Sequence, residues 1–362
     1  MRLKLLSIGI LCLLGAVSLA TQAEIVEKRT THATLAEKNL DHSLERARRL
    51  SKAQPNSPSA AKAVVDLLLM RLQFYRDYAD LDELQSLCER WHNDTRAQAQ
   101  YLCADVYAAR HDFSTALGSL ATASDNGGSC WDTRRRINAI GATLQIDVGP
   151  AFVNAALPDK PSEKKSMSYE VLVAQAALET ARGNAVSAIA HYQQAVTNYA
   201  DVSPYPVAWA WYQVAELLRD TDAVAATAYY AEALKYLPDY IAPRVELASL
   251  QLELGQTERA LDNLGYAAAR SEDPDIHGLI ASTPAGTLPQ VQRDNALKKA
   301  TTGFSKLLER HPYAFADHAA EVYAVSDAKE AQHLRTLLKK QKSVVQSTLA
   351  NWSSTNCSGE KS

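Results

Sequence analysis

One short helical motif recurs along the chain, and this repetition constrains the fold more than any other feature. The clearest copy reads Gly183-x4-Ala188-x3-Tyr192-x2-Ala195. Its first alanine recurs at steps of 38, 34 and 40 residues, as Ala226, Ala260 and Ala300. Periods near ~34 residues are typical of stacked helix–turn–helix units. The sequence therefore predicts an all-α chain built from consecutive helical hairpins.

The spacing of the motif has a physical cause. Residues at intervals of four and three lie on one face of a helix. Alanine leaves room where two helices cross closely, and the Tyr, Leu or Phe between the alanines fills the space beside the crossing. A glycine such as Gly183 supplies the turn before the helix, and a proline such as Pro238 or Pro312 follows its end. Each copy thus predicts the second helix of a hairpin.

This pattern resembles the tetratricopeptide repeat (TPR) family. The resemblance covers about residues 60–125 and 169–340, and it is strongest over 169–274. His111 and Thr221 stand where the family usually has glycine, and Leu84 stands where it has alanine. The resemblance implies an α-solenoid of stacked TPR-like hairpins that binds a protein or peptide. In such an array we expect each hairpin to contact only its neighbours.

The N-terminus has the features of a secretory signal. Arg2 and Lys4 precede an apolar run, which ends at the small-residue stretch Thr21-Gln22-Ala23. The run is shorter than a membrane-spanning helix, so we expect cleavage after Ala23 and a periplasmic or secreted protein. An uncleaved anchor is the alternative. A lipoprotein is disfavoured, because Leu11 precedes Cys12 where a small residue is needed.

The composition excludes a generally basic nucleic-acid binder. The formal charge is −3, and it becomes −5 once Arg2 and Lys4 leave with the signal. We also expect no membrane span in the mature chain. His311, Asp317 and His318 form the closest group of potential metal ligands, but they do not converge like a closed metal shell. We therefore expect no metal and no cofactor.

Cysteine spacing predicts one disulfide bond. Cys88 and Cys103 lie on the predicted helices 80–91 and 97–110, symmetrically about the turn at 92–95. They should face each other at one height, and an exported protein permits their oxidation. Two reduced, buried cysteines are the alternative. The sequence does not determine whether Cys130 and Cys357 pair.

Composition and periodicity divide the chain into seven segments. We expect helix 328–342 to end near Lys339, Lys340 and Lys342, whose charges suit a helix C-terminus. The predicted boundaries are a signal peptide at 1–23, a leader and capping helix at 24–59, TPR-like hairpins at 60–125, a degenerate hairpin or loop at 126–168, a regular array at 169–274, degenerate hairpins at 275–342 and a polar tail at 343–362.

Candidate binding residues follow from the register of the repeats. In TPR solenoids the first helix of each hairpin lines the groove, and aromatic, Arg and carboxylate side chains are common at interface hot spots. The candidates beside the packing stripe are Tyr101, Asp105, Trp211, Arg219 and Glu253. The alternative for Trp211 is that it packs between neighbouring helices.

The sequence favours a non-enzymatic function. No phosphate-binding glycine loop, Gly-x-Ser-x-Gly elbow or His-Glu-x2-His pair occurs. The leading hypothesis is an exported scaffold that binds a protein or peptide, as an adaptor or assembly factor of the cell envelope. A structural subunit that does not use its groove is the alternative. A hydrolase of an envelope polymer, with its site in 130–168 or 271–290, is less favoured.

Overall fold

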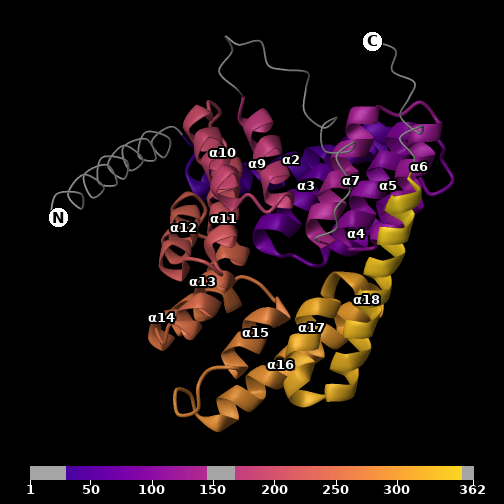
Figure 1. Cartoon of the computed structure of the whole chain (residues 1–362). Helices are drawn as coiled ribbons and strands as arrows, with labels where there is room; N and C mark the ends of the chain where they lie inside the picture. The colour runs from indigo at the N-terminus through magenta and orange to yellow at the C-terminus, as the bar shows by residue number, and fades with distance from the viewer. Residues whose placement is uncertain (1–29, 145–167, 353–362) are drawn as a thin grey trace, which may run out of the picture. The chain divides into compact units, whose positions relative to one another are not determined.

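The computed structural model describes residues 30–144 and 168–352, and helices dominate them (Figure 1). The predicted signal peptide, most of the predicted leader and the predicted loop at 158–166 lie outside the described residues. The chain forms two compact units. Of the described residues, 30–38 and 168–238 form the first unit, and 39–144 and 239–352 form the second. Among the described residues, no helix is both long and apolar enough to cross a membrane.

The first unit contains two helical hairpins of the regular array. Its helices are α9 (Tyr169–Ala181), α10 (Ala185–Asn198), α11 (Pro204–Leu218) and α12 (Ala223–Tyr236). The alanines of the motif are fully buried, Ala188 and Ala195 in α10 and Ala226 and Ala233 in α12. Gly183 adopts a φ of 76°, which is the left-handed turn expected before α10. These hairpins confirm the predicted repeat register.

The second unit contains the remaining hairpins. Its helices are α3 (Pro58–Tyr75), α4 (Asp80–Glu89), α5 (Ala97–Ala109), α6 (Phe113–Asp125), α7 (Cys130–Leu144), α13 (Ile241–Glu253), α14 (Thr257–Ala268), α15 (Pro274–Ala281), α16 (Gln290–Arg310), α17 (Pro312–Ser326) and α18 (Ala328–Asn351). Helix α2 (Ala33–Ala53) spans the boundary between the units. Hairpins pack in sequence order here too, α5 on α6, α13 on α14 and α17 on α18. The predicted all-α fold of solenoid-type hairpins is confirmed.

The second unit also contains contacts that a linear array does not have. One hydrophobic core joins the N-terminal helices α3, α4 and α5 to α16, α17 and α18. Its members include Leu68, Leu84 and Leu102 from the first group and Phe315 and Leu334 from the second. The expectation that each hairpin contacts only its neighbours is therefore wrong in this unit. The first and last hairpins bury each other's apolar faces, which terminal repeats would otherwise expose.

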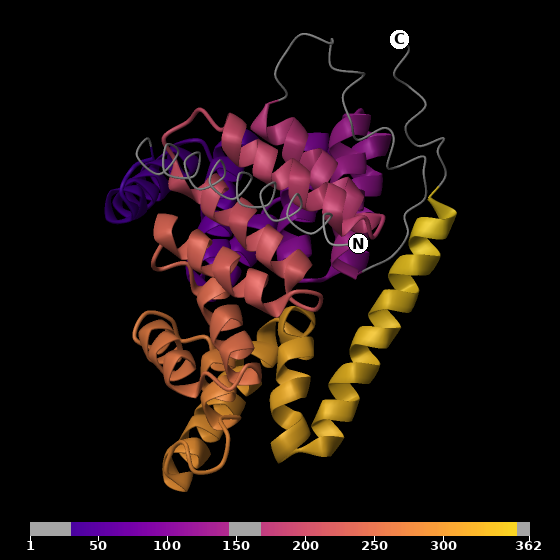
Figure 2. The same ribbon diagram turned by 60° about the vertical axis from the view of Figure 1, so that its left-hand side comes forward.

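Helix α18 is longer than the sequence indicates, and it appears as one unbroken helix in Figure 2. It runs past Lys342 to Asn351, so the helical part of 343–351 is not a polar tail. Val345 and Leu349 lie one turn apart and are buried in a hydrophobic cluster that also contains Phe113 of α6 and Ile137 of α7. Serine and glutamine occupy the exposed positions between them. Two buried residues in a polar segment gave too weak a periodic signal to predict this end of the helix.

His111 shows how the fold accommodates a departure from the repeat pattern. It occupies the glycine position before α6 and adopts a φ of 53°. A left-handed conformation costs a non-glycine residue roughly 1–2 kcal/mol. Its ring stacks on Phe113 with centroids 5.2 Å apart, and its carbonyl accepts a hydrogen bond from Gln341 of α18. These contacts offset part of the cost.

Candidate functional site

Two predicted groove residues, Tyr101 and Asp105, hold α7 against α5. The Tyr101 hydroxyl donates to the Ser129 carbonyl at 2.7 Å, and its ring lies under the Arg136 guanidinium at 4.5 Å. Asp105 accepts two hydrogen bonds from Arg136, at 2.7 and 2.9 Å. Tyr101 is only 8% exposed. Arg136 thus brings both candidates together in an interhelical contact, where they present little surface to a partner.

Trp211 is packed within the first unit. Its ring stacks on Tyr229 of α12 with centroids 5.5 Å apart and an interplanar angle of 23°. The Tyr229 hydroxyl in turn accepts a hydrogen bond from Gln193 of α10 at 2.9 Å. Trp211 is 5% exposed, and its buried indole N–H has no hydrogen-bond acceptor in the described residues. This burial favours the packing alternative over a direct contact with a partner.

The other two candidates lie at helix ends. Arg219 caps the C-terminus of α11 and is half-buried. Glu253 is the last residue of α13 and is exposed. Glu253 is the one exposed residue of the five candidates, and Arg219 is half-buried like Asp105. Both helix-end residues stay candidates for partner binding.

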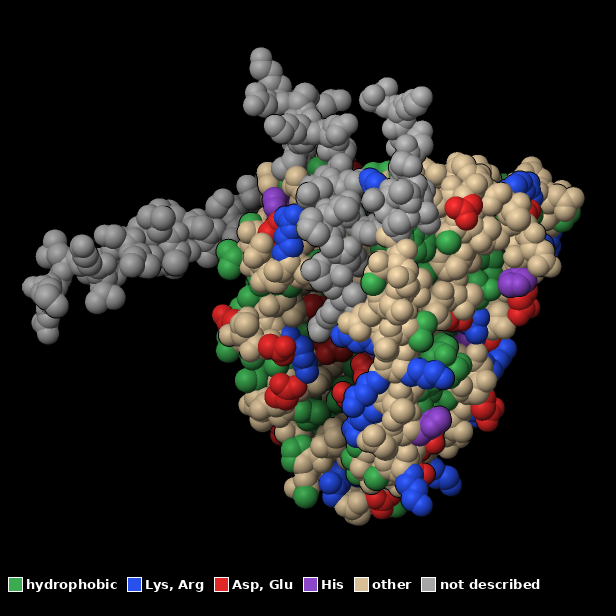
Figure 3. All heavy atoms as spheres, turned by 45° about the vertical axis from the view of Figure 1, so that its right-hand side comes forward, with side chains coloured by type: hydrophobic (Ala, Val, Ile, Leu, Met, Phe, Trp, Pro, Cys, Tyr) green, Lys and Arg blue, Asp and Glu red, His purple; other side chains and the backbone are tan. Residues whose placement is uncertain are grey.

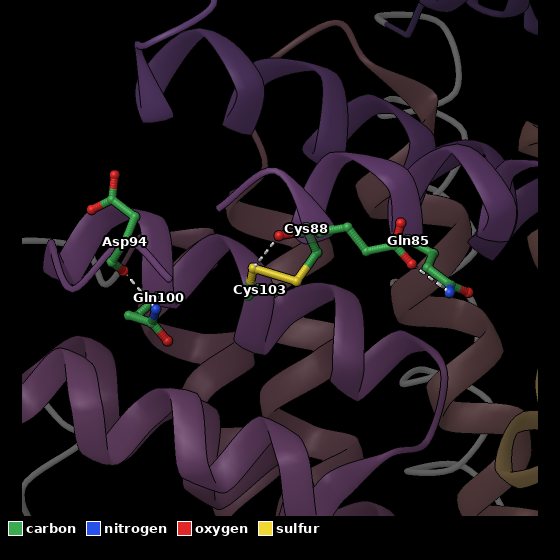
Figure 4. The surroundings of a disulfide bond; sticks show 6 residues. Gln85, Cys88, Asp94, Gln100 and Cys103 are labelled. Atoms are coloured by element: carbon green, nitrogen blue, oxygen red, sulfur yellow. Dashed lines mark hydrogen bonds between the residues drawn. A yellow bond between two sulfur atoms is a disulfide. The ribbon is translucent and has the colours of Figure 1, made fainter. Parts of the chain in front are cut away.

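Cys88 and Cys103 lie at disulfide-bonding distance, as the sequence predicts (Figure 4). Their Cα atoms are 5.0 Å apart, and both side chains are buried between α4 and α5. The turn beside them is fixed by Gln100, whose amide donates to the Asp94 carbonyl at 2.6 Å. The bond therefore joins the two antiparallel helices close to the turn that connects them.

A buried charge network connects α3, α15 and α17, and sequence reasoning missed it. Arg76 ends α3 in a left-handed conformation and pairs with Asp273, which is 1% exposed. Asp273 also caps α15 by accepting from the Asp275 backbone N–H at 3.0 Å. Asp275 lies 3.7 Å from Arg76 and 2.7 Å from the imidazole of His318 on α17. The hydrogen bond and charge of Asp275 raise the pKa of His318 to about 9.

A second network connects α4, the end of α5 and the junction of α16 with α17. His311 is 2% exposed, and its Nδ1 accepts from Arg110 at 3.1 Å. Its Nε2 lies 3.1 Å from Asp82, which also pairs with Arg310. Burial lowers the pKa of His311. His311 and His318, which the sequence places near each other, therefore belong to different networks.

These networks join helices, and their chemistry is that of structural ion pairs. The carboxylates of the first network face a guanidinium and an imidazole, and the Ser271 hydroxyl oxygen accepts a hydrogen bond from the Asp273 backbone N–H at 3.2 Å. Among the described residues, no group of three or more His, Cys, Asp and Glu is arranged to hold a metal ion.

The outward side of α18 carries an uncompensated positive charge. Its cationic side chains are Lys329, Arg335, Lys339, Lys340 and Lys342, which we call the α18 basic face. All are exposed except Lys342, which is half-buried. Within the described residues, none of the five has an ion-pair partner or a side-chain hydrogen bond. Figure 3 brings the side of α18 forward, and basic and acidic side chains are both seen over the lower half of the view.

Comparisons with known proteins give no family for this chain. No family model matches the chain, and no curated protein matches it in sequence. One similar solved structure is the TPR domain of P58(IPK), at 13% identity over 92% of this chain and 97% of that one, with a TM-score of 0.23. Another is a computationally designed self-assembling cyclic homooligomer, at 15% identity over 88% and 98%, with a TM-score of 0.13. At these values the likeness does not identify a family.

Proposed function

We propose that this protein is an exported helical-repeat scaffold that binds a protein or peptide, and that it acts as an adaptor or assembly factor in the cell envelope. The observation that carries the proposal is that the buried charged side chains pair with one another between helices. Its buried acids and bases end in ion pairs between helices, such as Arg76 with Asp273 and Arg136 with Asp105. The surface left to act on other molecules consists of helix faces, which suit recognition of a helix or an extended segment.

The disulfide supports the export part of this proposal. Disulfides form and persist in oxidising compartments, and they are rare in reducing ones. Mass spectrometry of the native protein should find a chain that starts near Glu24. An intact Met1 in a membrane fraction would instead support the uncleaved anchor.

Photo-crosslinking tests partner binding directly. A photoreactive residue at Arg219 or Glu253 should capture a discrete protein from an envelope extract. The photoreactive residue placed instead at Val325 serves as a control for random contact, because Val325 is 80% exposed and lies at the end of α17. Equal labelling at all three sites, or labelling at none, would contradict a binding surface at the two candidates.

The same experiment separates the scaffold from the structural subunit. Arg219→Ala and Glu253→Ala change side chains outside the core, so circular dichroism should confirm that both variants fold. In the scaffold hypothesis the folded variants lose the captured protein. If they remain in a native complex of unchanged size, the structural subunit replaces the scaffold.

A further inference from the structure

The α18 basic face has no structural explanation within the described residues. A cation near the C-terminus of a helix is stabilised by the helix dipole, but this effect is confined to the last turn. Because α18 continues to Asn351, Lys339, Lys340 and Lys342 lie in its middle. The dipole explanation that the sequence indicated is therefore wrong.

The arrangement of these charges costs helix stability. Arg335, Lys339 and Lys342 follow one another at spacings of four and three, so they form a row of like charges along one side of the helix. Like-charge pairs at these spacings destabilise a helix. Glu330 is the only carboxylate in α18, and it lies near the helix start. No carboxylate of the described residues forms an ion pair with the row, whereas a merely solvated helix face usually carries mixed charges.

We infer that the α18 basic face binds an acidic segment of a partner protein. This inference rests on the proposed scaffold function and names the chemistry of its partner. The stretch from Lys329 to Lys342 spans about 20 Å along the helix axis. An acidic helix with carboxylates at spacings of four and three places its charges at the same intervals as the row, so it can form ion pairs with the row at several points.

The surface between the charges disfavours the other anionic occupants. Gln332, Thr336 and Ser343 lie among the cations and are exposed. A helix that lies on a membrane needs several large apolar side chains on its exposed side, but Leu334, Val345 and Leu349 of α18 are buried in the protein core, and Val344, 44% exposed, stands alone among the polar residues. Single-stranded nucleic acid is bound through aromatic stacking as well as charge, and α18 contains no aromatic residue before its C-cap.

The test uses the full mature protein and a fluorescein-labelled acidic peptide of about 20 residues, with Glu at spacings of four and three. We expect saturable binding that weakens as the salt concentration rises from about 0.05 to about 0.5 M, because exposed charge pairs are screened. Phosphatidylglycerol vesicles and a thymidine oligonucleotide are measured in parallel.

The key variant is Arg335→Glu/Lys339→Glu/Lys340→Glu. The matched control is Lys298→Glu/Lys299→Glu/Lys306→Glu on α16, where all three lysines are exposed and the net charge changes equally. We expect the α18 variant to bind the peptide at least about tenfold more weakly, and the α16 variant to stay within about threefold of the unmodified protein. Replacing the three α18 residues with Gln provides a second variant if charge reversal prevents folding.

Three results would overturn the inference. The folded α18 variants could bind the peptide as tightly as the α16 control, or the unmodified protein could fail to bind it. The vesicles or the oligonucleotide could instead bind the unmodified protein more tightly than the peptide does. None of these results changes the photo-crosslinking outcome at Arg219 and Glu253, so the scaffold function is judged separately.

Discussion

The ion pair between Arg76 and Asp273 allows a quantitative test of how the second unit is held together. Asp273 is 1% exposed and the Arg76 side chain 14% exposed. Replacing Arg76 with Met leaves the Asp273 carboxylate buried without its cation. Removing one partner of a buried pair typically costs about 3–5 kcal/mol. Asp273 keeps the hydrogen bond from the Asp275 backbone, so we expect a loss of about 3 kcal/mol, at the lower end of that range.

Replacing the other partner, Asp273, should cost less stability. Asn in place of Asp273 can still cap α15, because its side-chain oxygen accepts from the same backbone N–H. Arg76 keeps Asp275 at 3.7 Å and some access to water. We therefore expect Asp273→Asn to cost about 1–2 kcal/mol. The double variant Arg76→Met/Asp273→Asn should be more stable than Arg76→Met alone, because it removes the unpaired charge.

Urea unfolding followed by circular dichroism gives the free energy of unfolding of the unmodified protein, the two single variants and the double variant. The double-mutant cycle then isolates the interaction energy between Arg76 and Asp273. Two outcomes would refute the reasoning. The first is a loss below about 1 kcal/mol for Arg76→Met, which would mean that water reaches Asp273. The second is a double variant as unstable as the sum of the single variants, since independent sites are additive.

Four further predictions test other parts of the structure. The pKa of His318 is raised to about 9, so its ion pair with Asp275 stabilises the fold fully below about pH 6.5, and this stabilisation is lost as the pH rises through about 9. His318→Gln should therefore remove this part of the pH dependence of the melting temperature. Ala226→Leu should overpack a fully buried helix crossing and cost about 1–3 kcal/mol in urea unfolding, and an unchanged midpoint would mean that the repeat register is wrong. Truncation after Lys342 removes two buried side chains of α18 and should cost about 3–6 kcal/mol, measured against truncation after residue 352. Changing both Cys88 and Cys103 to Ala should cost about 3 kcal/mol, and peptide mapping without reductant should recover the two cysteines joined.

The binding residues were harder to predict than the hairpins. The sequence predicts Tyr101 and Trp211 as binding residues because aromatic side chains are common at interfaces, yet both are buried between helices. The same property, a large apolar ring with one polar atom, suits an interface and a helix crossing equally. Helical spacing places such a residue beside the packing stripe, but it does not show whether another helix covers that side.

Local interactions could be predicted from the amino-acid sequence alone. The Ala188, Ala226 and Ala260 series fixes which face of each helix is buried, because residues three and four apart share a face whatever the rest of the chain does. The Cys88–Cys103 pair belongs to the same class, because both cysteines lie equally far from one short turn. Helix boundaries inside the regular repeats follow from the same short-range pattern.

The contacts between surfaces far apart in the sequence are seen only in the tertiary structure. Arg76 and Asp273 are 197 residues apart, and each alone has the character of an ordinary surface charge. The last turns of α18 are helical because Val345 and Leu349 find an apolar surface on α6 and α7. Such contacts depend on the shapes of two complete surfaces, and no period in the sequence encodes which surfaces will be brought together.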